Sequence, residues 1–117
     1  MTHLSPTRRA LFCGLAAALM AAAMPVSAQD IGGSYRAEGR NSDGSSYSGT
    51  VQINENGGAI EMQWQIGSRS FAGVVTRNGD VVRVNWGDAY PVVYVRMPSG
   101  ELHGTWSNGR ALERLIP

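Results

Sequence analysis

The chain is short of the side chains from which catalytic and metal sites are usually built. Its 117 residues include one cysteine, Cys13, two histidines, His3 and His103, and no lysine. Because Cys13 and His3 lie in the first 28 residues, the rest of the chain has no thiol and one imidazole. This excludes disulfides, thiol catalysis, zinc–thiolate centres and iron–sulfur clusters from that part. We expect no enzyme activity, no bound metal and no cofactor.

The net charge is also small. Ten arginines stand against nine acids, and omitting the first 28 residues leaves eight arginines against the same nine acids. A domain that binds nucleic acid carries a strongly basic face. The near-neutral balance therefore predicts that nucleic acid is not a partner.

Long hydrophobic runs are missing apart from one near the N-terminus. The 15 residues 10–24 are apolar, follow the pair Arg8 and Arg9, and precede the small residues of 26–28. A basic segment, a short apolar run and a small-residue cleavage site are typical of a secretory signal peptide. The run is shorter than the about 20 residues that a membrane span needs.

We therefore expect residues 1–28 to be a signal peptide that is cleaved after Ala28. Residues 29–117 would then be exported, to the periplasm or the exterior, as a single domain with no transmembrane span. The paired arginines leave both the general secretory route and the twin-arginine route open.

What the exported part does contain is a regular succession of short strand-like segments separated by turn dipeptides. Asn-Gly and Asp-Gly pairs, such as those at 56–57 and 43–44, tolerate the positive φ that tight hairpins require. Eight segments lie between the turns: Tyr35–Arg40, Tyr47–Asn54, Ile60–Ile66, Ser70–Thr76, Val81–Trp86, Val92–Met97, Glu101–Trp106 and Ala111–Ile116.

Apolar and polar side chains alternate within these segments. Met62 and Trp64, for example, face opposite to Gln63 and Gln65, which gives a sheet with one packed face and one solvated face. Strands that recur about every 8–12 residues indicate a sandwich or a barrel, and eight hairpin-linked strands are enough to close. We predict an all-β domain that forms a small antiparallel up-and-down β-barrel of about eight strands. A two-sheet β-sandwich is the alternative.

A weak repeat places a glycine on the inward face of three segments. Gly49, Gly73 and Gly104 each lie two residues after a large apolar side chain and two before another apolar one. An inward glycine lets a strand bend sharply and lets a bulky neighbour cross over it. The repeat therefore favours a sheet that curves enough to close.

The tryptophans are the best candidates for contact with a ligand. Trp64, Trp86 and Trp106 share the inward phase of three segments, and aromatic side chains inside a barrel can hold an apolar or cyclic molecule. The alternative is that three indoles fill the interior of a small barrel and form its core. Tyr90, in the loop 87–91, is a further candidate: it could anchor a partner or cap the end of the barrel.

One charged pair disturbs the alternation near the C-terminus. Glu113 and Arg114 lie among alanine, leucine and isoleucine, so either phase of the strand places a charge among apolar side chains. A partly buried charge needs a partner. We expect a salt bridge that ties the last strand to the first, through Arg36 or Glu38, and contact with a ligand is the alternative.

The turn glycines and core aromatics also resemble those of a known group. The matching positions are Tyr35, Gly39, Asn41, Asp43–Ser45, Tyr47, Gly49, Trp64, Ile66–Gly67, Asn78–Gly79, Val92–Tyr94, Gly100, Leu102, Gly104, Trp106, Glu113 and Leu115. This pattern resembles short exported bacterial proteins often labelled "fibronectin-binding protein". The resemblance implies a shared small all-β fold, and the label implies adhesion to a host matrix protein.

These observations predict an exported, non-enzymatic binding protein. We expect it to contact a protein or a cell-envelope partner through its barrel loops or outer surface. The alternative is a carrier that holds an apolar or aromatic small molecule in an interior lined by tryptophan. The candidate binding residues are Trp64, Trp86, Trp106 and Tyr90.

Overall fold

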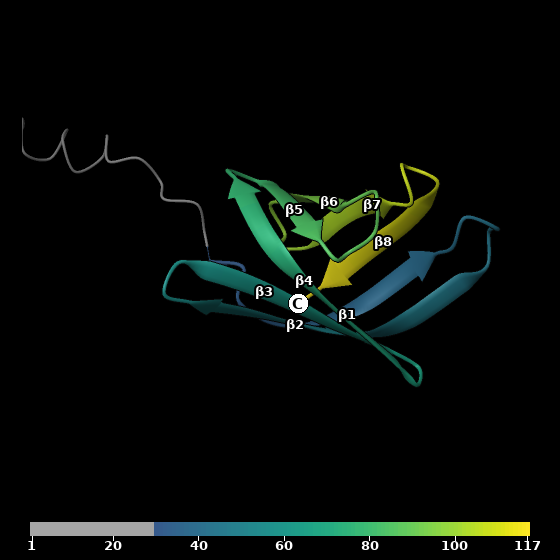
Figure 1. Cartoon of the computed structure of the whole chain (residues 1–117), viewed down its shortest axis with the longest axis horizontal. Helices are drawn as coiled ribbons and strands as arrows, with labels where there is room; N and C mark the ends of the chain where they lie inside the picture. Colours follow the sequence, from purple (N-terminus) through teal and green to yellow (C-terminus); the bar gives the residue numbers. More distant parts are fainter. Residues whose placement is uncertain (1–29) are drawn as a thin grey trace, which may run out of the picture.

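The computed structural model describes residues 30–117, and the expected signal peptide lies outside these residues. Eight β-strands follow one another along the described part of the chain (Figure 1). They are β1 (Gly33–Arg40), β2 (Ser46–Asn56), β3 (Ala59–Ile66), β4 (Arg69–Asn78), β5 (Val81–Asn85), β6 (Val92–Arg96), β7 (Leu102–Trp106) and β8 (Ala111–Ile116). Residues 30–117 contain no helix with the length and apolarity to cross a lipid bilayer.

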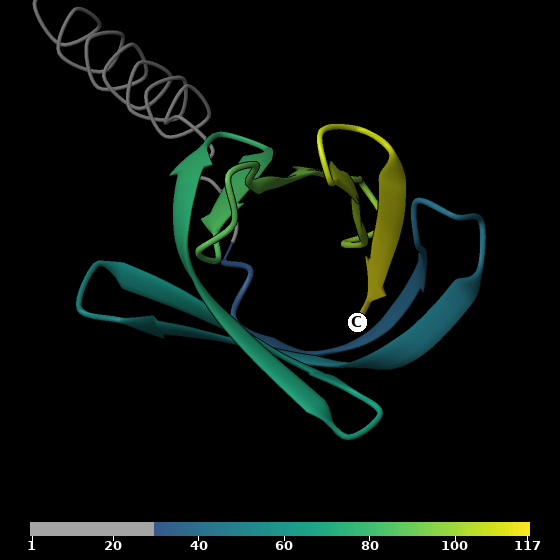
Figure 2. The ribbon, with the colours of Figure 1, turned by 45° about the vertical axis from the view of Figure 1, so that its right-hand side comes forward.

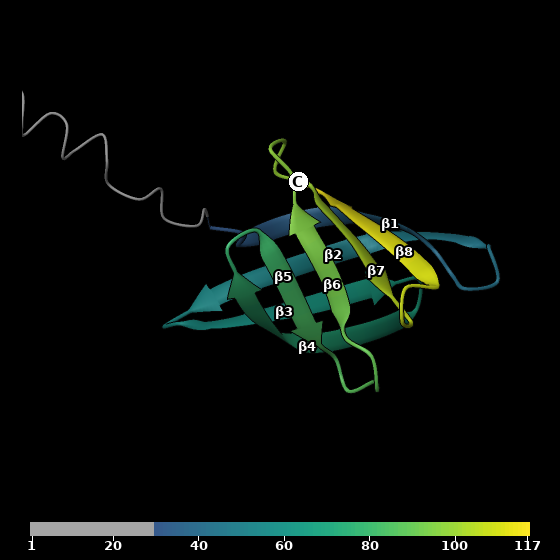
Figure 3. The same ribbon diagram turned by 90° about the horizontal axis from the view of Figure 1, so that it is seen from above.

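Each strand pairs with the next, and β8 pairs back to β1, so the sheet closes into an antiparallel barrel. Figure 2 shows the strands arranged as a ring, and Figure 3 shows β5 to β8 lying across the longer strands β2 to β4. The predicted up-and-down barrel of eight strands is therefore confirmed, and the two-sheet sandwich is wrong.

Consecutive antiparallel strands place their connections alternately at the two ends of the barrel. The β1–β2, β3–β4, β5–β6 and β7–β8 connections meet at one end, which we call the mouth. The turns use the predicted dipeptides: Gly44 and Gly79, for example, have φ values of 90° and 61°.

The inward side chains pack densely in the half of the barrel away from the mouth. Tyr94 and Met62 are fully buried at mid-strand, and Leu102, Leu115 and Val82 are fully buried nearer the end opposite the mouth. Towards the mouth, the inward side chains are only half-buried: Tyr47, Ile66, Phe71, Trp86 and Trp106. The barrel is thus a packed core at one end and an open interior at the other.

The salt bridge that closes the barrel involves Arg114 and not Glu113. Arg114 points outward, and its Nη2 lies 2.6 Å from Oε1 of Glu38, which pairs with it across β1 and β8. The expectation of a closure pair through Glu38 is confirmed for Arg114. For Glu113 it is wrong, because the strand phase that turns Arg114 to solvent turns Glu113 into the barrel.

Candidate functional site

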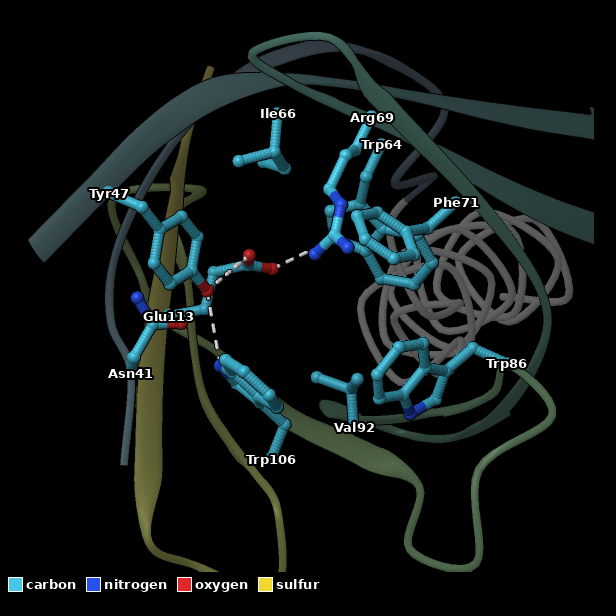
Figure 4. Close-up of a pocket in the computed structure, with 10 residues that line it drawn as sticks. All are labelled: Asn41, Tyr47, Trp64, Ile66, Arg69, Phe71, Trp86, Val92, Trp106 and Glu113. Atoms are coloured by element: carbon cyan, nitrogen blue, oxygen red, sulfur yellow. Dashed lines mark hydrogen bonds between the residues drawn. The ribbon is translucent and has the colours of Figure 1, made fainter. Parts of the chain in front are cut away.

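The open half of the barrel contains a cavity of about 360 Å³ (Figure 4). The residues that line it lie in the mouth halves of the strands, except Asn41 and Trp86, which follow β1 and β5 directly in the connections at the mouth. The lining consists of Asn41, Tyr47, Trp64, Ile66, Arg69, Phe71, Trp86, Val92, Trp106 and Glu113. Figure 4 shows these side chains arranged around a common space.

Four aromatic rings form a continuous wall of this cavity. The ring centroids of Tyr47 and Trp106 lie 6.2 Å apart, those of Trp106 and Trp86 6.1 Å, and those of Trp86 and Phe71 5.9 Å. The interplanar angles of 72° to 89° make all three contacts edge-to-face. Edge-to-face contacts are a preferred arrangement of aromatic pairs, so each ring helps to fix its neighbour.

Trp64 and Glu113 lie deeper than this wall. Each has 6% of its surface exposed, although both still contact the cavity. Glu113 is the one buried charged residue between positions 30 and 117. A buried carboxylate is costly unless hydrogen bonds replace its hydration, so the groups around it decide whether it is tolerated.

Three side chains donate hydrogen bonds to the Glu113 carboxylate. The Tyr47 hydroxyl donates to Oε1 at 2.8 Å, the Trp64 indole Nε1 donates to Oε2 at 2.9 Å, and the Tyr94 hydroxyl also donates to Oε2. An indole N–H is only a donor, and an ionised carboxylate only accepts. The arrangement is therefore the one that an ionised Glu113 requires.

A fourth side chain, Trp106, determines which atoms donate and which accept in this hydrogen-bond network. The Trp106 Nε1 donates to the Tyr47 hydroxyl oxygen at 3.1 Å (Figure 4). Because the indole can only donate, the Tyr47 oxygen accepts from Trp106, and the Tyr47 O–H donates its hydrogen bond to Glu113. Two rings of the cavity wall, Tyr47 and Trp106, thus belong to one hydrogen-bonded chain with the buried carboxylate.

Two glycines let the tyrosines reach the carboxylate. In the register of the barrel, Gly39 of β1 lies between Tyr47 and Glu113, and Gly104 of β7 lies between Glu113 and Tyr94. A Cβ on Gly39 would overlap the Tyr47 ring, and one on Gly104 would lie 2.5 Å from Tyr94 Cδ1. Each glycine therefore leaves the space over which a tyrosine crosses to Glu113.

The environment also holds the tyrosines in their neutral form. Burial raises the pKa of Tyr94 well above its ordinary value, and the Glu113 charge and hydrogen bond raise it further. The same causes, in the same order, raise the pKa of Tyr47. Both hydroxyls therefore remain donors throughout the neutral pH range.

Two further polar side chains contact the cavity near the mouth. Arg69 begins β4, and Figure 4 shows its side chain directed towards the cavity that Asn41 and Glu113 also line. The ion pairs formed between residues 30 and 117 do not include Glu113. The carboxylate is thus compensated by neutral donors, and the one cationic side chain of the cavity lining is the exposed Arg69.

The structure brings three of the four predicted site residues together. Trp64, Trp86 and Trp106 all line the cavity, but Tyr90 does not. Tyr90 is 44% exposed on the β5–β6 loop, and its backbone carbonyl accepts a hydrogen bond of 3.1 Å from the Trp86 Nε1.

Sequence reasoning did not select Tyr47, Phe71 and Arg69 as members of the site, and it gave Glu113 a different main role. The glycine repeat contained part of the signal, since Gly49 and Gly73 follow Tyr47 and Phe71 by two residues. An inward glycine on the neighbouring strand marks where a tyrosine can cross, which is the relation of Gly39 to Tyr47.

Residues 30–117 contain no group of three or more His, Cys, Asp or Glu side chains that could hold a metal ion. His103 points outward, and its Nε2 lies 2.8 Å from Oε1 of Glu101.

Comparison with known proteins identifies the fold and leaves the family open. No protein-family model and no curated protein matches this chain. Among solved structures, a redesigned beta barrel matches with a TM-score of 0.50 and 17% sequence identity, over 74% of this chain and 90% of the other. The likeness shows a shared β-barrel fold, and the resemblance to proteins labelled "fibronectin-binding protein" stays a prediction.

Proposed function

We propose that this protein is an exported, non-enzymatic barrel that binds a small organic molecule in the cavity at its mouth. The observation that carries the proposal is the half-hollow interior, in which aromatic side chains line an open space of about 360 Å³. Export rests on the expected signal peptide in residues 1–28.

The size and lining of the cavity fit this role. Small-molecule sites commonly have volumes of about 300–1,000 Å³, mostly apolar walls and a few placed polar groups. Here the walls are supplied by Trp86, Trp106 and Phe71, and the polar groups by Glu113 and Arg69. A ligand of one or two rings suits the small end of that range.

A pair of tryptophan variants tests the proposal. We expect Trp86→Ala to leave the protein folded but to lose ligand, because Trp86 is half-buried beside the cavity and stands outside the dense core. Trp64→Ala removes a buried indole that holds Glu113, and we expect it to destabilise the fold by about 3–5 kcal/mol.

The measurement is thermal unfolding with tryptophan fluorescence, against a panel of small aromatic molecules, lipids and glycans. A raised midpoint with a panel member, lost in Trp86→Ala, supports the proposal. A folded Trp86→Ala variant that keeps the full midpoint rise contradicts binding in this cavity.

A second candidate is a protein or cell-envelope partner on the outer surface. Large apolar side chains are exposed there, with Tyr90 on a loop at the mouth and Val74, Val95 and Leu112 on strands. An exposed aromatic side chain can anchor an interface. If this function operates, Tyr90→Ala weakens partner capture without a change in unfolding temperature or in small-molecule binding.

A further inference from the structure

We infer that the molecule held in the cavity is an organic cation, a protonated amine with an apolar or aromatic body. This inference rests on the proposed function and specifies the ligand class. The feature that carries it is a buried carboxylate, Glu113, which lines the aromatic cavity. Glu113 forms no ion pair with any arginine in residues 30–117.

Glu113 has room for one more donor on the oxygen that binds Tyr47. A carboxylate has about four acceptor positions, two on each oxygen. Within residues 30–117, Oε2 accepts from both Trp64 and Tyr94, whereas Oε1 accepts from Tyr47 alone. A ligand N–H directed at Oε1 would complete the set, and an ammonium would also neutralise the charge.

The walls of the cavity suit the same ligand. A cation near the face of tryptophan, tyrosine or phenylalanine is attracted by the ring quadrupole, and the attraction grows when water is excluded. Tyr47, Trp106, Trp86 and Phe71 form a continuous aromatic arc in the cavity that Glu113 also lines (Figure 4). A neutral aromatic body can pack on this arc while its ammonium group meets Glu113.

Arg69 is the competing cation. Its side chain lines the same cavity but is exposed, so it can turn away to solvent when a ligand enters. In this arrangement Arg69 opposes a cationic ligand and would favour an anionic one. The ligand preference of the unaltered protein therefore discriminates between Glu113 and Arg69 as the group that sets specificity.

The first experiment compares three probes of one shape by titration calorimetry on the unaltered protein. The probes are 2-phenylethylamine, its neutral analogue 2-phenylethanol, and the anion 3-phenylpropionate. We expect the amine to bind at least about tenfold more tightly than the other two, since only the ammonium adds an opposite charge to its hydrogen bond with Glu113.

Each other outcome has a distinct meaning. If the alcohol binds as tightly as the amine, the cation inference fails and the cavity function stands. If the anion binds most tightly, Arg69 sets specificity and the inference also fails. If none of the three binds, both the inference and small-molecule binding in this cavity are contradicted.

Two variants then separate the roles of the charged groups. Glu113→Gln should abolish the advantage of the amine over the alcohol. Because this variant disturbs a buried network, Arg69→Gln supplies an independent test at an exposed position. It should strengthen amine binding by about two- to fivefold, as expected for loss of one exposed like charge.

The matched control is Arg83→Gln. Arg83 is exposed on the outward face of β5, so this change alters net charge without touching the cavity. We expect no change in affinity for the amine. An Arg69→Gln variant that binds the amine more weakly than this control would overturn the inference.

Discussion

At the scale of single residues, the buried Glu113 carboxylate determines how the side chains around it are arranged. A buried carboxylate costs several kcal/mol of unfolding free energy unless donors replace its water. Tyr47, Trp64 and Tyr94 supply those donors from three different strands. The same contacts that make the charge tolerable also fix the positions of the side chains near the floor of the cavity.

The Tyr94 hydroxyl is expected to matter for stability. Tyr94→Phe removes one donor from a buried charged acceptor, which costs about 1–3 kcal/mol of unfolding free energy. Urea denaturation measures the loss. Tyr90→Phe is the matched control, because the Tyr90 ring is exposed, and it should stay within about 0.5 kcal/mol of the parent. A Tyr94→Phe variant as stable as this control would contradict the network.

Alkaline pH gives a second test of the same residue. Below 10.0, the ordinary pKa of tyrosine, Tyr94 is protonated in both the folded and the unfolded chain, and its contribution to stability is complete. Above that value the unfolded chain loses the proton while the raised pKa keeps it on the folded one, so stability falls as pH rises. Tyr47 acts in the same direction.

The measurement is urea denaturation at a series of pH values, together with tyrosinate absorbance of the folded protein. We expect absorbance from Tyr47 and Tyr94 to rise only above pH 10.0, and the fall in stability to be shallower in Tyr94→Phe. Equal slopes for the variant and the parent would show that Tyr94 does not have a raised pKa.

The sequence marks Glu113 as unusual but does not determine whether its side chain points into the barrel or towards solvent. Alternation in 111–116 places either Glu113 or Arg114 inward, and both phases leave apolar side chains outside. The choice depends on register, because Glu113 must lie beside Gly39 and Gly104 for the tyrosines to reach it. Register between strands distant in sequence is not readable from the pattern of one strand.

At the scale of elements, β8 closes the barrel and carries the buried charge. It pairs with β7 on one side and with β1 on the other, so neither terminal strand presents an open edge. An exposed edge would offer unpaired backbone groups to another chain. Closure therefore joins the first and last strands into the same cooperative unit as the middle ones.

Hydrogen exchange tests this closure. The amides of β1 and β8 that pair with each other should exchange as slowly as those of β3 and β4, through opening of the whole barrel. Nuclear magnetic resonance of the backbone amides resolves the strands individually. Rapid exchange confined to β1 and β8 would mean that the barrel opens at this seam.

The crossing of strands over glycine gives a prediction at the same scale. Gly104→Ala places a methyl group 2.5 Å from Tyr94 Cδ1 and from the Val93 carbonyl oxygen, so the aromatic ring or the backbone must shift. Overpacking of this kind costs about 1–3 kcal/mol, measured by urea denaturation. His103→Ala, at an exposed position on the same strand, should leave the free energy of unfolding nearly unchanged. If the two variants lose equal stability, the proposed steric overlap at Gly104 is contradicted.

The strands themselves could be predicted almost residue by residue. The predicted segment Ala111–Ile116 has the same bounds as β8, and Tyr35–Arg40 falls short of β1 by two residues at its start. Turn dipeptides and alternation are local signals, and they act within a few residues. The segments Val92–Met97 and Glu101–Trp106 each ran one residue too far, at the polar loop between β6 and β7.

At the scale of the whole molecule, the barrel is packed at one end and hollow at the other. The sequence distinguishes inward from outward side chains but leaves open whether inward tryptophans fill the interior or line a space. That depends on strand tilt and stagger, which set the width of the barrel and are not encoded in any single strand. Trp64 belongs to both the core and the cavity lining, whereas Trp86 and Trp106 are half-buried side chains that line the cavity.

The measurement that tests the central claim most directly is a titration of the protein with 2-phenylethylamine, followed by the indole N–H resonances of its three tryptophans. These N–H groups donate to Glu113, Tyr90 and Tyr47, so each reports on a known part of the cavity. We predict saturable shifts of the Trp86 and Trp106 signals, with backbone amides at the end opposite the mouth unchanged. Indole signals that do not move, or shifts confined to the outer face of the barrel, would contradict ligand binding inside it.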